Sequence, residues 1–310
     1  MQLAWPGARY CIQISRKEIV AENVERLIEE YGKSKITRRE FIHRAVVLTG
    51  SLVAATTLVD SLRPTTANAA QVDPNDPALT SSDVKFATPD GAGISGYLTR
   101  PKGDGQRPAV LVVHLWNGID DHIRDVARRL AKAGYVALVP DLLSRYGGTS
   151  SFASQEAAIA AARKLDDETI TKDLSGGATF LNGQNFVRAN RIGVTGFCWG
   201  GGKALMFTTR SKDLAASVIY YGETPRNVND VKNITAPVLA HYGELDDRIN
   251  PGLPKLEEAM KKYGKSFEYK IYAGAPHSFN SDTSPQSYRP EAAKEAWSRT
   301  LAFFKKHLED

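Results

Sequence analysis

The 310-residue chain is 42% hydrophobic and 24% charged, an ordinary composition for a globular protein, which excludes a wholly disordered chain. Its net charge is only +5, and three of these charges lie before Ala70, where ten Lys and Arg stand against seven Asp and Glu. The rest of the chain is therefore nearly neutral and has no basic stripe, and we expect no nucleic-acid partner. Two cysteines, Cys11 and Cys198, exclude a disulfide framework and a Cys-based zinc site.

Residues 1–69 have the order of features of an export signal. Arg38-Arg39 precedes an apolar stretch over residues 45–59, and Ala67-Asn68-Ala69 has the arrangement of a cleavage site. The apolar stretch is too short for a comfortable bilayer span. The order resembles a twin-arginine signal, here with a long n-region, which predicts recognition by the twin-arginine export machinery and a periplasmic mature form without a stable membrane span. The alternatives are an uncleaved membrane anchor and a cytoplasmic protein with an N-terminal arm.

Two further segments of this region have recognisable patterns. Residues 15–31 have the apolar spacing of an amphipathic helix. Residues 70–82 are rich in Pro, Asp, Asn and Ser, which predicts a flexible lead-in. The folded domain is therefore expected to span residues 83–310.

From residue 83 the hydrophobic pattern alternates between the strand and helix periods. Strands are predicted at 84–88, 94–98, 109–115, 135–139, 191–195, 217–221, 237–242 and 267–272. Helices are predicted at 121–133, 154–165, 168–181, after residue 202 to about 209, 253–263 and 290–307. The first two strands flank a turn-rich segment, which predicts a hairpin. The alternation as a whole predicts one α/β domain with a mainly parallel central sheet and helices on both faces.

Gly196-Phe-Cys198-Trp-Gly200 lies between a predicted strand and a predicted helix, as a nucleophile elbow does. The glycines leave room in a tight turn that presents the sulfur at a helix N-terminus, where the dipole favours the thiolate. Gly-rich turns of this kind also bind phosphates, but the spacing of neither a P-loop nor a dinucleotide site follows here. The pattern therefore predicts a nucleophilic cysteine, and the alternative is a structural turn with an inert thiol.

A carboxylate and a histidine follow two later predicted strands. Asp246 lies beyond strand 237–242, and His277 lies beyond strand 267–272. The carboxyl ends of parallel strands share one edge of the sheet, so we expect both to meet Cys198 there. The order nucleophile, acid, base is that of the α/β-hydrolases. We predict His277 as the base and Asp246 as the acid, with Asp247 as the alternative acid.

An oxyanion hole is expected beside the elbow. It would use the backbone N–H of Trp199 and a second N–H from Leu115 or Trp116, which follow strand 109–115. His114 closes that strand and is the other histidine of interest.

Several motifs resemble the dienelactone hydrolase family (carboxymethylenebutenolidases). They are Gly196-Phe-Cys-Trp-Gly-Gly, Tyr242-Gly-Glu-Leu-Asp-Asp-Arg-Ile-Asn, Pro276-His-Ser-Phe-Asn, Asp125-Val-Ala-Arg-Arg-Leu-Ala and Pro140-Asp-Leu-Leu-Ser-Arg. The likeness extends over residues 84–308. It implies an α/β-hydrolase fold and cofactor-free hydrolysis of a small ester or lactone, with Cys198 as nucleophile, Asp246 as acid and His277 as base.

The sequence departs from this family at two positions. Leu115 stands where the family usually has a glutamate that contacts the resting cysteine. The arginine that follows the base in well-known members is also missing, and Arg145 or Arg289 could take its place. We expect Trp116, Trp199, Tyr146 and Arg145 to line an apolar substrate pocket. A ligand-binding protein on a hydrolase scaffold, inactive without the glutamate, is the alternative function.

Overall fold

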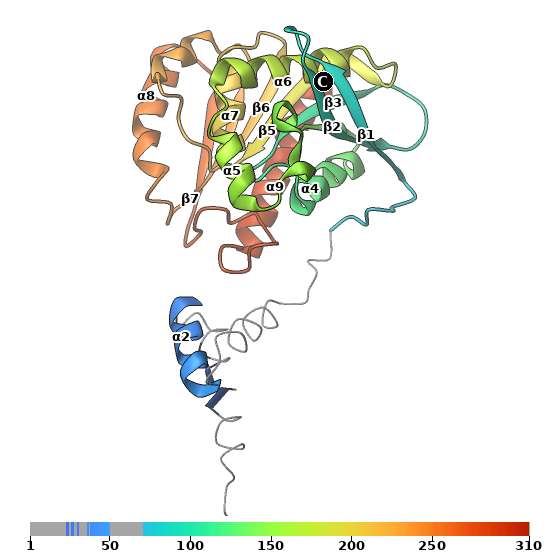
Figure 1. Cartoon of the computed structure of the whole chain (residues 1–310). Helices are drawn as coiled ribbons and strands as arrows, with labels where there is room; N and C mark the ends of the chain where they lie inside the picture. Colours follow the sequence, from blue (N-terminus) through green and yellow to red (C-terminus); the bar gives the residue numbers. More distant parts are fainter. Residues whose placement is uncertain are drawn as a thin grey trace, which may run out of the picture. The chain divides into compact units, whose positions relative to one another are not determined.

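The computed structural model describes residues 23, 24, 26, 27, 30, 36, 38–49 and 71–309. The chain divides into two compact units, Met1–Asn68 and Ala69–Asp310 (Figure 1).

In the first unit, helix α2 (Arg38–Thr49) begins at the arginine pair. Phe41 and Ala45 of this helix are buried together with Leu27. The cleavage motif at 67–69 and the end of the apolar stretch, residues 50–59, lie outside the described residues, as does most of the helix predicted at 15–31. None of the helices in the described parts of the chain is long and apolar enough to cross a membrane.

The second unit is built on one eight-stranded sheet, in the order β1-β2-β4-β3-β5-β6-β7-β8. Its strands are β1 (Leu79–Ala87), β2 (Gly93–Pro101), β3 (Arg107–Val113), β4 (Val136–Pro140), β5 (Val187–Phe197), β6 (Leu214–Tyr220), β7 (Val238–Gly243) and β8 (Phe267–Tyr272). The β1–β2 hairpin and the pairing of β2 with β4 are antiparallel. All other neighbouring strands are parallel, as the sequence pattern predicts.

Helices cover both faces of this sheet (Figure 1). They are α4 (Asp121–Lys132), α5 (Gln155–Ala162), α6 (Asp167–Asn182), α7 (Trp199–Thr208), α8 (Leu253–Lys262) and α9 (Pro290–Phe304). Residues of α5, α6, α7 and α8 share one buried apolar cluster with the sheet, and residues of α4 and α9 share the other. Strands β3 and β4 read as unbroken apolar runs because their alternating side chains enter both clusters.

The structure corrects the predicted start of this domain. Leu79–Ala87 is already strand, and the N–H of Val72 donates to Asp125 Oδ1 at 2.9 Å while Arg128 Nε donates to the carbonyl of Val72. Residues 71–82 are therefore not a flexible lead-in. Asp73 and Asp76 accept hydrogen bonds from backbone N–H groups two residues later, so the polar composition forms defined turns. The exposed edge strand β1 then lacks the apolar alternation that would reveal it.

Candidate active site

Cys198 lies in the sharp turn between β5 and α7, with φ of 57° and ψ of −122°. A backbone of this kind is strained for any residue but glycine. The turn closes tightly because Gly196 packs on the backbone of Gly200, and Gly200 packs on the backbone of Val113 and His114. The N–H of Cys198 donates to the carbonyl of Tyr220 at the end of β6, at 3.1 Å. These contacts fix a partly buried thiol at the N-terminus of α7.

His277 joins this thiol to a buried carboxylate. Its Nε2 lies 3.0 Å from Cys198 Sγ, and its Nδ1 lies 2.5 Å from Asp246 Oδ2. Asp246 is 3% exposed, and Asp247 is exposed and does not contact the histidine. The three residues come from the ends of β5, β7 and β8, as the sequence predicts. Of the two aspartates that the sequence leaves open, Asp246 is the one that holds the imidazole.

The charge on His277 depends on these two neighbours. Burial opposes the imidazolium, but the hydrogen bonds and charges of Asp246 and Cys198 outweigh it and raise the pKa of His277 to about 9. Tyr221 packs edge-on against the imidazole at 4.9 Å between ring centroids. Tyr221 (φ of 39°) and Ser278 (φ of 64°) also have left-handed backbones, so strained residues surround the imidazole.

The expected oxyanion donors lie close to the elbow. Within residues 71–309, the N–H of Trp199 has no hydrogen-bond acceptor. The carbonyl of Leu115 accepts from His114 Nδ1 at 2.6 Å and from the N–H of Gly118 at 3.2 Å. Because a trans peptide is planar, the N–H of Trp116 points away from those two donors. The backbone of residues 115–118 is thus held in one orientation.

His114 is a structural residue that fixes this loop. It is fully buried, and its Nε2 accepts from the N–H of Leu142 at 3.0 Å while Nδ1 donates to Leu115. Burial lowers the pKa of His114, so the ring stays neutral with its proton on Nδ1. The loops that follow β3 and β4 are joined through one imidazole.

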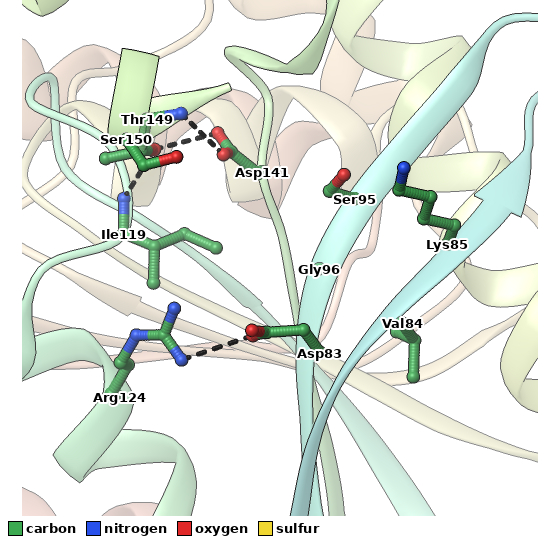
Figure 2. Close-up of a pocket in the computed structure, with 10 residues that line it drawn as sticks. All are labelled: Asp83, Val84, Lys85, Ser95, Gly96, Ile119, Arg124, Asp141, Thr149 and Ser150. Atoms are coloured by element: carbon green, nitrogen blue, oxygen red, sulfur yellow. Dashed lines mark hydrogen bonds and ion pairs between the residues drawn. The ribbon is translucent and has the colours of Figure 1, made fainter. Parts of the chain in front are cut away.

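A second connection between the same loops is visible in Figure 2. The N–H of Ile119 donates to Thr149 Oγ1, and that hydroxyl donates to Asp141 Oδ1 at 2.9 Å. These residues form one wall of a cleft of about 560 Å³. Arg124, paired with Asp83 at 3.4 Å, forms another part of the wall. These contacts stabilise the loop after β3, and we therefore regard this cleft as structural and assign no ligand to it.

The four residues predicted to line the substrate pocket lie in different surroundings. Trp116 and Trp199 stack with their ring centroids 5.0 Å apart. Leu115 and Trp116 line a cleft of about 570 Å³, together with polar residues of the loop after β3, of α4 and α5, and of the segment after His277. The two tryptophans therefore connect the elbow to a cleft with mixed polar and apolar walls.

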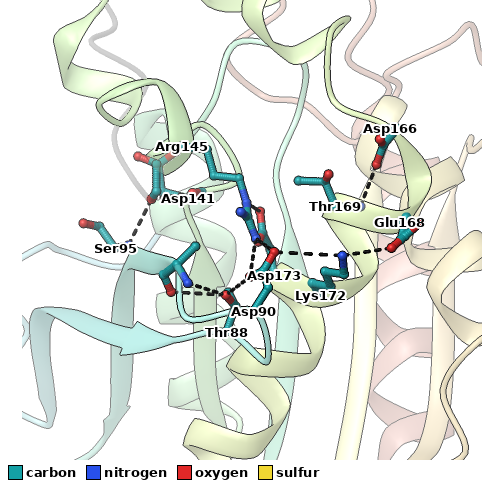
Figure 3. A network of polar contacts seen from close by, with 12 residues as sticks. Thr88, Asp90, Ser95, Asp141, Arg145, Asp166, Glu168, Thr169, Lys172 and Asp173 are labelled. Carbon is teal, nitrogen blue, oxygen red and sulfur yellow. Dashed lines mark hydrogen bonds and ion pairs between the residues drawn. The ribbon is translucent and has the colours of Figure 1, made fainter.

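Arg145, by contrast, is not available to a substrate. Its guanidinium donates to Asp173 at 2.7 Å and to Asp90 at 2.9 Å, tying the β1–β2 turn to α6 (Figure 3). Asp173 is fully buried, so its charge needs this partner. Arg289 donates to the carbonyls of Gly274, Gln286 and Tyr288. Neither arginine contacts the triad residues, and Tyr146 is an exposed neighbour of Arg145.

Sequence reasoning did not single out Arg248. Its Nη2 lies 3.3 Å from His277 Nε2, and its Nη1 donates to Glu223 Oε1 at 2.6 Å. Its place in the motif after Tyr242, two residues beyond Asp246, was the available signal. In the described part of the chain, no group of His, Cys, Asp and Glu side chains is arranged to hold a metal ion.

The sheet order and the elbow define an α/β-hydrolase. A family model described as the dienelactone hydrolase family matches residues 94–308, and the chain belongs to that family. A "Putative carboxymethylenebutenolidase" of Methylorubrum extorquens is 34% identical over 240 residues, covering 74% of this chain and 82% of that protein. A "Probable 2-oxo-3-(5-oxofuran-2-ylidene)propanoate lactonase" of Bradyrhizobium sp. is 36% identical over 223 residues, covering 68% and 89%. The crystal structure of a "Putative Dienelactone Hydrolase" from Klebsiella pneumoniae superposes with a TM-score of 0.68 at 30% identity, covering 74% and 99%.

Proposed function

We propose that the protein hydrolyses a small ester or lactone through an acyl-enzyme, with Cys198 as nucleophile, His277 as base and Asp246 as the acid. The observation that carries the proposal is the unbroken contact from Asp246 through His277 to Cys198 Sγ at a strained elbow. A thiol beside an imidazole that a buried carboxylate orients is the arrangement of a cysteine nucleophile.

The reaction takes place in two steps. The Cys198 thiolate attacks the carbonyl carbon, a C–S bond forms, and the C–O bond to the alcohol breaks while His277 Nε2 gives its proton to the departing oxygen. Water then attacks the thioester, gives a proton to Nε2, and the C–S bond breaks to restore the thiolate. In both steps the oxyanion is stabilised by the N–H of Trp199 and by that of Leu115 or Trp116.

The substrate class rests on the family and on the cleft beside the tryptophans. The names of the two relatives refer to a butenolide and to a furanone lactone, which are small cyclic esters. The stacked pair Trp116–Trp199 gives the elbow an apolar neighbour suited to such a ring.

One observation favours a second candidate, a ligand-binding protein without turnover. Leu115 places an apolar side chain at the loop after β3, where the family resemblance leads us to expect a carboxylate. The fold alone does not separate the two functions.

Activity measurements on the full-length protein separate them. We expect hydrolysis of p-nitrophenyl acetate and of simple lactones, an acetyl adduct on Cys198 by intact mass, and a loss of at least about a thousandfold in Cys198→Ala. Cys11→Ala, the other cysteine, is the matched control and should keep full activity. Turnover that persists in Cys198→Ala, or a wild type that binds lactones and hydrolyses none, would refute the proposal.

Export belongs to the same proposal. The order of Arg38-Arg39, the apolar stretch and Ala67-Asn68-Ala69 supports transport by the twin-arginine route and cleavage near residue 69. The hydrolase would then act in the periplasm, and an uncleaved signal would instead anchor it to the membrane.

A further inference from the structure

Arg248 places a cation at the reacting nitrogen of His277. The guanidinium Nη2 is 3.3 Å from Nε2, the same atom that lies 3.0 Å from Cys198 Sγ. The other end of the guanidinium is paired with Glu223, which follows β6. Both side chains are more than half exposed, so this pair can rearrange without disturbing the core.

The chemistry of the two groups makes this contact depend on protonation. A guanidinium only donates hydrogen bonds, so Nε2 can accept from Arg248 only when it carries no proton. The titratable and charged groups that face the imidazole are Cys198 from the elbow, Asp246 and Arg248 from the loop after β7, and Tyr221 from the end of β6. Asp246 and a Cys198 thiolate favour the imidazolium, and Arg248 opposes it.

This balance changes during the proposed reaction. In the proposed reaction the free enzyme attacks with the Cys198 thiolate, and the hydrogen bond and charge of Cys198 are among the causes that raise the pKa of His277 to about 9. Once the sulfur is acylated it is a neutral thioester, and that contribution is gone. The base must now be unprotonated, because it has to accept a proton from water.

We propose that Arg248 is a positioning residue that keeps Nε2 of His277 unprotonated in the acyl-enzyme, and that Glu223 holds the guanidinium in place and moderates its charge. The inference rests on the proposed function, since it concerns the second step of that reaction. Arg248 acts through His277 and forms no bond with the substrate.

The test follows hydrolysis of p-nitrophenyl acetate by the full-length protein as a function of pH. In Arg248→Gln we expect the acid limb of kcat to move up by about one pH unit, because a nearby cation shifts the pKa of an ionisable group by an amount of this order. At neutral pH kcat and KM should fall together by up to about tenfold, with kcat/KM little changed. A burst of p-nitrophenol and a persistent acetyl adduct should appear.

Three further variants define the effect. Arg248→Lys retains the charge and should restore most of kcat, and Arg226→Gln, an exposed arginine on the loop of Glu223, should behave as wild type. Glu223→Gln exposes the full charge of Arg248 and should move the acid limb of kcat in the opposite direction, to lower pH.

The inference is overturned if Arg248→Gln leaves the pH profile of kcat unchanged, or if kcat/KM falls in this variant as much as kcat does. It is also overturned if Arg248→Gln and Glu223→Gln move the acid limb of the kcat profile in the same direction. A wild type that forms no acyl-enzyme would instead overturn the proposed function, and this inference with it. The two failures are therefore distinguishable in the same experiment.

Discussion

Replacing Gly200 by alanine tests whether the contact between the elbow and the loop after β3 sets the catalytic geometry. A Cβ atom at this position would lie 2.8 Å from the carbonyl carbon of Val113 and closer still to the carbonyl oxygens of Val113 and His114. Non-bonded carbon atoms prefer about 3.5 to 4.0 Å. Because the obstructing atoms are backbone, α7 and the end of β3 must separate by roughly 1 Å.

That displacement acts on the two proposed oxyanion donors at once, since Trp199 precedes Gly200 and Leu115 follows His114. A misplacement of about 1 Å can reduce turnover by about a hundredfold, which corresponds to about 2.7 kcal/mol in the activation barrier. Stability should change less. Overpacking costs about 1–3 kcal/mol, and alanine gains back about 1 kcal/mol over glycine within a helix.

The assay compares kcat/KM for p-nitrophenyl acetate with the free energy of unfolding in urea. Gly202→Ala is the control on the same helix, because its Cβ would meet the nearest atom, the backbone nitrogen of Glu223, at 3.2 Å. Because this approach is less close, Gly202→Ala should cost less activity and less stability than Gly200→Ala. If Gly200→Ala retained activity within about threefold of wild type, the elbow contact would not position the donors and our reasoning would be wrong.

Three other predictions concern charge and export. In Asp246→Asn, most of the pH dependence of the free energy of unfolding that comes from the titration of His277 should be lost. The rise of the His277 pKa from 6.5 to about 9 corresponds to about 3 kcal/mol of folding stability. This contribution is present below pH 6.5 and is lost as the pH rises through 9. The free energies of unfolding in urea at pH 6 and pH 10 should therefore differ less in the variant than in the wild type. Leu115→Glu should slow alkylation of Cys198 at neutral pH and slow ester hydrolysis, because a carboxylate near the sulfur disfavours the thiolate; faster turnover would show that the natural protein is an impaired enzyme. Changing Arg38 and Arg39 together to lysine should block export, measured by cell fractionation and intact mass, and unaltered processing would contradict the signal.

The sequence predicts the core of the fold well because buried parallel strands and amphipathic helices leave strong patterns. Strand β8 begins and ends where the sequence predicts, and β3 and β4 differ from prediction by one or two residues. The exposed edge strand β1 starts five residues before its predicted position. Its first residues are Leu-Thr-Ser-Ser, which pair with β2 through backbone hydrogen bonds and therefore need no apolar pattern.

The candidate triad could be predicted because the carboxyl ends of parallel strands meet at one edge. The position of Arg145 could not be predicted, since its partners Asp90 and Asp173 are 55 and 28 residues away in the sequence. Arg248 was missed for the same reason. Its place in the motif after Tyr242 was the available signal, but that motif does not indicate whether the side chain lies against His277 or in solvent.

The left-handed backbones at Tyr221 and Ser278 have a consequence for how this protein can be stabilised. Each such residue stores about 1–3 kcal/mol of strain, and both lie against or beside the imidazole of His277. Selection for heat resistance alone would therefore favour substitutions such as Ser278→Gly, which relaxes the backbone and also frees the loop that carries His277. Thermostable variants of this chain should fall into two groups: those with gains distant from the site, which keep turnover, and those with gains at these positions, which lose it.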